Sequence, residues 1–289
     1  MAGLKNIRTR ISSVKNTEQI TQAMKMVAAA RLKRAQMRIL NLRPPAENIL
    51  SVMADVALSC NIRHPLLEKK EKKRKVLLVV LTSDRGLCGG FNNNICRFAE
   101  SFYHSQKQKD LDFFFIGRKA KSYFQFRGIP SVGEMFQLDR EISYPLAGKV
   151  AHRLMKNFSD GEYDGIYFIY NSFQSAISQK VIKEIFLPID ISQAPLIHQS
   201  QFSRDMIFEV PPEELLENLI EKHFTVQVYR CMCESLAAEY GARMSSMDNA
   251  TRNAQDIVSR LTLTFNKMRQ GAITTELIEV SSGAEAMKG

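Results

Sequence analysis

The first 60 residues carry apolar positions at steps of three and four, the pattern of a helix with one apolar face. These positions form three groups: Leu4, Ile7, Ile11 and Val14, then Ile20, Met24 and Val27, then Leu32, Ala35, Ile39 and Leu42. The groups are offset, which predicts that the apolar stripe slips sideways twice within one helix. Pro44-Pro45 is expected to kink or break this helix, because proline removes a backbone donor and clashes one turn back.

Residues 76–195 alternate short apolar runs with helical patterns. The runs at 76–81, 113–116 and 165–170 fit strands buried on both faces, and 181–187 fits a further strand. Helical stretches are expected near 94–106, 118–126 and 145–158. This alternation predicts a small Rossmann-like α/β sheet domain.

The segment 211–287 begins with Pro211-Pro212-Glu213-Glu214, a favourable helix start with acidic residues at the positive end of the helix dipole. Apolar or small residues then recur every three or four positions, at Tyr229, Met232, Leu236, Tyr240, Met244, Met247, Ala250, Ala254, Ile257, Leu261, Phe265 and Met268. So long a helix needs a partner along its stripe. We therefore predict that both terminal segments pack as a long antiparallel two-helix coiled coil, whose second helix extends beyond the first.

Together these patterns predict an α/β fold in five parts. They are an N-terminal coiled-coil helix (1–60, kinked near 44–45), a basic linker (61–75), the sheet domain (76–195), a second linker (196–210) and a C-terminal coiled-coil helix (211–287). The run from Lys69 to Lys75 fits either a solvated linker or a docking patch.

Charge is concentrated at one end of the 289-residue chain, whose formal net charge is +10. Residues 1–75 hold 17 lysines and arginines against 5 acidic residues, so they carry the whole excess and favour an acidic partner. The longest apolar run, 76–81, is far too short to span a bilayer, and the N-terminus lacks an apolar signal core. Five scattered cysteines form no disulfide framework. A cytoplasmic protein without a membrane span is expected.

Candidate chemistry is sparse. The five histidines lie apart, so no metal or catalytic site is expected. The loop 83–92 (SDRGLCGGFN) follows a strand and precedes a helix, where α/β proteins bind ligands, but it lacks both known phosphate-loop spacings. A tight structural turn is favoured over a nucleotide site. A nucleotide-binding α/β protein with helical arms remains the alternative, and a basic nucleic-acid binder has no recognition motif to support it.

Five stretches together resemble the gamma subunit of the F-type ATP synthase. They are MAGLKNIR (1–8), NTEQITQAMKMVAAA (16–30), SDRGLCGG (83–90), RMSSMDNAT (243–251) and FNKMRQGAITTEL (265–277). The resemblance implies a non-catalytic central rotor shaft inside a ring of alpha and beta subunits, with epsilon and the c-ring at its foot. Proton flow would turn the shaft and so drive ATP synthesis, or ATP hydrolysis would turn it and pump protons. The complex would lie at the cytoplasmic face of the inner membrane. No cofactor and no nucleic acid are implied.

The same resemblance assigns roles to individual residues. It places Met24 near an acidic lever segment of the beta subunit, and it places Arg269 and Gln270 against a beta-subunit loop. Arg243 and Thr274 would be coupling positions. The final residues of the chain, among them Leu277, Ile278, Val280, Ala284 and Met287, would turn in an apolar collar. From the pattern alone, Met24 fits coiled-coil core equally well, and Arg269 and Gln270 could lie on a solvated face.

Overall fold

The computed structural model describes residues 2–60, 62–68, 75–106, 110–136, 142–175, 178–191 and 208–287. The basic run at 69–74 and most of the predicted second linker lie outside these residues. The chain divides into two compact units, one formed by residues 1–28 with 244–289 and the other by residues 29–243. Two helices, α1 (Ala2–Ser59) and α5 (Pro212–Ala286), contribute to both units. The five-part division inferred from the sequence stays a prediction.

The first unit is a pair of antiparallel helices from the two ends of the chain. Partners on α5 move back along the sequence as those on α1 move forward: Gly3 against Met268, Glu18 with Gln255, Thr21 with Thr251 and Lys25 with Asp248. The predicted antiparallel coiled coil is therefore confirmed. Beyond Met268, α5 continues to Ala286, and its described side chains there are exposed except that of Ala272, which is half-buried.

The buried stripe of α1 does not slip sideways, so that prediction was wrong. Buried and half-buried positions follow one unbroken repeat of four and three residues: Val14, Glu18, Thr21, Lys25, Ala28, Leu32, Ala35 and Ile39. Polar side chains occupy three of these positions, whereas Ile20 and Val27 are 60% and 53% exposed. The apparent slip arises because Glu18, Thr21 and Lys25 occupy the buried stripe and bond to polar residues of α5, while the nearby apolar residues lie outside the stripe.

The pair Pro44-Pro45 does not break α1, which is one helix from Ala2 to Ser59. The same repeat resumes beyond the prolines at Ile49, Met53 and Val56, of which the last two are buried. Tertiary packing along a stripe supplies most of the stability of a helix in a protein. Packing on both sides of the prolines therefore holds the helix together despite the two missing donors.

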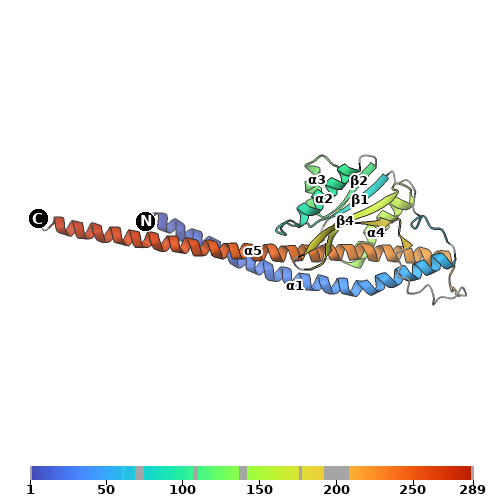
Figure 1. Ribbon diagram of the computed structural model, residues 1–289, viewed down its shortest axis with the longest axis horizontal. Coiled ribbons are helices and arrows are strands. Elements are labelled where there is room, and N and C mark those ends of the chain that lie inside the picture. Colours follow the sequence, from blue (N-terminus) through green and yellow to red (C-terminus); the bar gives the residue numbers. More distant parts are fainter. Residues whose placement is uncertain are drawn as a thin grey trace. The chain divides into compact units, whose positions relative to one another are not determined.

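In the second unit, a five-stranded sheet has the order β3-β2-β1-β4-β5. Figure 1 labels its three inner strands, β2, β1 and β4. Its strands are β1 (Lys75–Leu81), β2 (Asp110–Ile116), β3 (Gly133–Met135), β4 (Gly165–Phe173) and β5 (Gln179–Leu187). The first four are parallel, and β5 runs antiparallel at the edge beside β4. The predicted α/β sheet is confirmed, with β3 an addition too short to leave a sequence pattern.

Helices cover both faces of this sheet. Helices α2 (Phe91–Ser105) and α3 (Arg118–Gln125) pack on the face that carries Val76, Leu78 and Val80. The other face carries Phe114 and Phe168. Arg153 of α4 (Tyr144–Ser159) lies over the Phe114 ring, and Phe186, which stacks on Phe168, contacts Phe224 of α5. The central strands β1, β2 and β4 are thus covered on both sides, as their apolar runs require.

Candidate functional site

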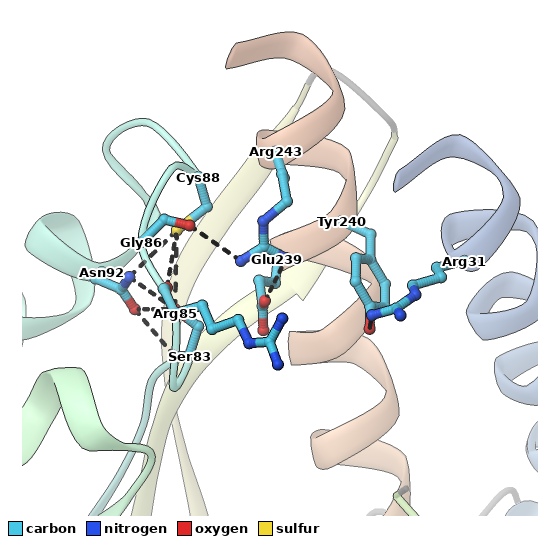
Figure 2. Close-up of polar contacts among 9 residues, drawn as sticks. All are labelled: Arg31, Ser83, Arg85, Gly86, Cys88, Asn92, Glu239, Tyr240 and Arg243. Atoms are coloured by element: carbon cyan, nitrogen blue, oxygen red, sulfur yellow. Dashed lines mark hydrogen bonds and ion pairs between the residues drawn. The ribbon is translucent and has the colours of Figure 1, made fainter. Parts of the chain in front are cut away.

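The loop after β1 is held by its own side chains. Asn92 accepts a hydrogen bond from the Ser83 amide at 2.9 Å, and its own amide nitrogen lies 2.8 Å from the Ser83 hydroxyl and 3.2 Å from the Cys88 sulfur (Figure 2). The Asp84 carboxylate accepts from the Arg118 amide at 3.0 Å. Because these polar groups bond within the chain, the geometry favours the structural-turn interpretation over a nucleotide site.

Two backbone conformations shape this loop. Leu87 has φ +63° and Gly89 has φ +57°, both in the left-handed region. Glycine adopts this region without penalty, but leucine does so only where the surrounding structure holds it. The Leu87 side chain is 62% exposed, so the strained residue presents an apolar group to solvent.

Arg243 fastens α5 to this loop. Its guanidinium donates to the Gly86 carbonyl oxygen at 3.2 Å and pairs with Glu239 one helical turn earlier at 2.6 Å (Figure 2). The side chains of Arg243 and Glu239 are only 12% and 8% exposed. The predicted coupling residue is therefore largely buried in contacts within its own chain.

Tyr240, three residues before Arg243 on α5, contacts α1. Arg31 donates to the Tyr240 hydroxyl at 3.3 Å, and its guanidinium lies 5.7 Å from the centre of the ring. The Arg243 guanidinium lies 5.8 Å from the same ring centre. Cation–π attraction to two arginines thus supplements the apolar packing of this tyrosine. The loop, α5 and α1 meet here in one set of contacts.

Nothing in this site supports nucleophilic or metal chemistry. Burial raises the pKa of the Cys88 thiol, so the reactive thiolate is disfavoured. Cys231 and Cys233 are likewise buried, and burial raises the pKa of both. Among the described residues, no group of three or more His, Cys, Asp or Glu side chains could hold a metal ion.

The remaining predicted contact residues lie in the first unit. Met24 is half-buried on α1, while Arg269, Gln270 and Thr274 are exposed on α5. The Thr274 hydroxyl donates to the Gln270 carbonyl oxygen at 3.0 Å, which puts these two residues one turn apart on the helix. Apolar side chains are exposed further along α5, at Leu277 (65%), Ile278 (59%) and Val280 (71%). Their roles as partner contacts stay predictions.

Comparison with known proteins decides the family. A family model described as ATP synthase matches residues 3–287. The ATP synthase gamma chain of Bdellovibrio bacteriovorus is 54% identical over the full length of both chains, and that of Geobacter metallireducens is 42% identical, also over both full lengths. The chain belongs to the ATP synthase gamma-chain family. The prediction of a central rotor shaft, made from the resemblance, is confirmed.

Solved structures agree with this family. The gamma-chain fold matches a chain of the central stalk and c-ring of Tetrahymena thermophila mitochondrial ATP synthase, with a TM-score of 0.63 and 28% identity over 80% of this chain and 99% of that one. A chain of the Euglena gracilis mitochondrial ATP synthase matches with a TM-score of 0.69 over 99% and 95%. At 19% identity the second match speaks for the fold alone.

The sequence interpretation missed several residues that the structure brings together. Glu239 and Tyr240 join Arg243 at the loop, and Thr21 and Lys25 form polar pairs between α1 and α5. The signal for Thr21 and Lys25 was present in the sequence, because both residues sit on the unbroken repeat of α1. A search restricted to apolar residues could not find them.

Proposed function

We propose that this gamma chain transmits rotation without a catalytic site of its own. Proton flow through the membrane sector turns the c-ring, the chain turns with it, and ATP forms on the beta subunits; hydrolysis drives the reverse. The observation that carries the proposal is the match to gamma chains over the full length of both proteins. The mutually bonded polar groups of the 83–92 loop support it, since their side chains bond to one another and form no catalytic arrangement.

Coupling requires that the shaft contact the three beta subunits unequally. A shaft that contacted all three alike could not favour one conformation over another. In the helix pair, Ile20, Met26 and Val27 expose apolar surface on α1, while lysines and arginines give the same helix its positive charge. We propose that this mixed surface meets the acidic lever segment of beta through weak, solvated pairs that break at each step. Met24 lies among these residues.

The exposed part of α5 has a separate role. Arg269 and Gln270 would contact a loop of the beta subunit, and Thr274 would share in the coupling. The exposed Leu277, Ile278 and Val280 would turn within an apolar collar of the alpha and beta ring. Apolar contact has no fixed direction, so it can hold a turning axle.

The α/β sheet domain would bind epsilon and the c-ring. These contacts would place the complex at the cytoplasmic face of the inner membrane. No helix in the described part of the chain is long and apolar enough to cross a bilayer. The attachment is therefore proposed to be peripheral, through other subunits.

Reconstitution tests this function. The purified full chain should neither hydrolyse ATP nor bind nucleotide stoichiometrically. When it is added to the alpha and beta subunits of the same organism, it should co-purify with them in a defined complex that hydrolyses ATP. Tight nucleotide binding by the isolated chain would instead favour the alternative of a nucleotide-binding protein, and failure to assemble would contradict the proposal.

A further inference from the structure

A closed ring of side-chain contacts joins α5 to strands β4 and β5. On β4, the Tyr170 hydroxyl donates to one oxygen of Glu184 at 2.7 Å. The other Glu184 oxygen lies 2.7 Å from a guanidinium nitrogen of Arg230 on α5. A second nitrogen of Arg230 lies 3.2 Å from Glu234, which in turn accepts from the Ser172 hydroxyl at 3.0 Å. The ring thus begins and ends on β4.

Local structure places each member of this ring. Tyr170 and Ser172 are two apart on one strand, so their side chains emerge on the same face. Glu184 of β5 pairs with Phe168, two residues before Tyr170 on β4, so Glu184 lies diagonal to Tyr170 and within its reach. Arg230 and Glu234 are one helical turn apart on α5. The strands β4 and β5 therefore present their polar side chains to those of α5 at one place along the helix.

The ring is charged and partly buried. The side chains of Arg230 and Glu234 are 21% and 13% exposed, Tyr170 is fully buried, and the Glu184 side chain is 36% exposed. The third nitrogen of Arg230 donates to the Gln227 side-chain oxygen at 2.7 Å, so every nitrogen of the guanidinium has an acceptor. A planar group held on all its nitrogens has a fixed position and orientation.

Stability alone is a weak reason for such a ring. Replacing a buried ion pair by apolar residues of similar volume is often neutral or stabilising, because charged groups lose their hydration when buried. Directional hydrogen bonds, however, resist sliding and rotation in a way that apolar contact does not. Nearby, α5 meets the sheet through Phe224 and Phe186, whose ring centres are 6.1 Å apart, a contact without fixed register.

We infer that Arg230 is a positioning residue that locks α5 to β4 and β5, so that twisting load passes between the sheet and the helix. All members of the ring lie in the second unit, and the inference concerns that unit alone. It rests on the proposed rotor function. Arg230 contacts no substrate; it acts by holding the helix at a fixed angle on the sheet.

The test uses Arg230→Met in the complete ATP synthase, reconstituted in vesicles. ATP hydrolysis and ATP-driven proton transport are measured on the same sample. We expect hydrolysis to continue while the transport per ATP hydrolysed falls at least about twofold, the lower range for residues that modulate coupling between sites. The matched control is Arg127→Met, which removes an arginine that follows α3 in the chain and pairs with Glu100 of α2 at 2.7 Å. The control should leave the ratio unchanged.

Further variants separate positioning from folding. Arg230→Met leaves two carboxylates unpaired, so the triple variant Arg230→Met, Glu184→Gln, Glu234→Gln is prepared as well; it should regain thermal stability and assembly but keep the low transport ratio. Arg230→Lys, which keeps the charge without the fork, should recover the ratio only partly. A wild-type ratio in the triple or the lysine variant would overturn the inference. Absence of transport with the wild-type chain would instead contradict the rotor function itself.

Discussion

Thr21 and Thr251 face each other between α1 and α5, with their hydroxyl oxygens 2.8 Å apart and both side chains buried. Thr21 also lies 3.0 Å from the Glu18 carbonyl oxygen, and Thr251 lies 2.8 Å from that of Met247. Two hydroxyl hydrogens serve three contacts, so only two are made as hydrogen bonds at any time. Polar pairs at buried positions of a coiled coil fix its register at some loss of stability.

Valine substitutions test this pair. Thr21→Val or Thr251→Val alone should lower the free energy of unfolding by about 1 kcal/mol, because one hydroxyl loses its partner in a buried setting. The double variant should lie close to wild type, since two apolar groups of the same shape replace both. Urea unfolding of the full chain, followed by circular dichroism, measures the cycle.

Thr264→Val is the matched control for the threonine pair. Thr264 is exposed, and its hydroxyl bonds to the Arg260 carbonyl oxygen of its own helix at 3.0 Å. Its replacement should change the unfolding free energy by less than about 0.5 kcal/mol. Additive effects of the two buried substitutions would show that the hydroxyls do not interact.

The ion pair between Arg243 and Glu239, next to the 83–92 loop, should contribute far more to the unfolding free energy than an exposed pair of the same spacing. Arg243→Met leaves Glu239 without this cation at 8% exposure, and we expect a loss of about 3 kcal/mol in unfolding free energy. Arg252→Met removes the arginine of another i,i+4 pair on α5, with Asp248, in which Arg252 is 73% exposed. That loss should stay below about 1 kcal/mol. Equal losses in thermal or urea unfolding would contradict the role of burial.

His223 should make the chain less stable in acid. It is 4% exposed, lines a cavity of about 100 Å³ with Glu184, Asp190 and Gln227, and its Nδ1 atom has no hydrogen-bond partner within the described structure. Burial, with the charge of Arg230, lowers the pKa of His223 from 6.5 to about 4. Between these values the unfolded chain binds a proton that the folded chain does not.

The resulting stability is full above pH 6.5, falls as the pH drops toward 4, and falls no further below that. The loss attributable to His223 reaches about 3 kcal/mol. His223→Leu should flatten the curve of unfolding free energy against pH in this window, whereas His152→Gln, at an exposed position, should leave it unchanged. An unaltered curve in the leucine variant would refute the assignment.

Serine at the exposed apolar positions of α5 should affect the complex and not the chain. Leu277→Ser and Val280→Ser remove side chains that are 65% and 71% exposed, so the melting temperature and helix content of the isolated chain should not change. Assembly or turnover with alpha and beta should weaken if these residues turn in a collar. Gly283→Ala, another change in the same exposed stretch with open space around it, is the control.

Most of the fold could be predicted from repeating local patterns in the sequence. The buried runs predicted β1, β2 and β4 to within a few residues at either end, since a strand covered on both faces needs continuous apolar sequence. The run 181–187 likewise predicted most of β5, which lies at the sheet edge. The three-residue β3 leaves no such pattern and forms because β2 supplies its partner. The slip predicted in α1 failed because apolar spacing alone ignores polar residues that satisfy one another.

The candidate site could be foreseen only in part. Its loop follows a strand and precedes a helix, which the sequence indicates directly. The contacts that define it join residues far apart in the chain: Gly86 with Arg243, and Arg31 with Tyr240. Single arginines in a helix carry no local mark of such partners, because the partner depends on how the helix packs on the sheet.

Rotation of single molecules tests the rotor function most directly. The alpha and beta ring is fixed to a surface, and a visible probe is attached to the exposed Phe126 position as Phe126→Cys, in the sheet domain. On addition of ATP the probe should turn in one direction, with three pauses in each revolution, and should stop when ATP is removed. A probe that stays still, or moves without direction, while the complex hydrolyses ATP would show that this chain is not the shaft.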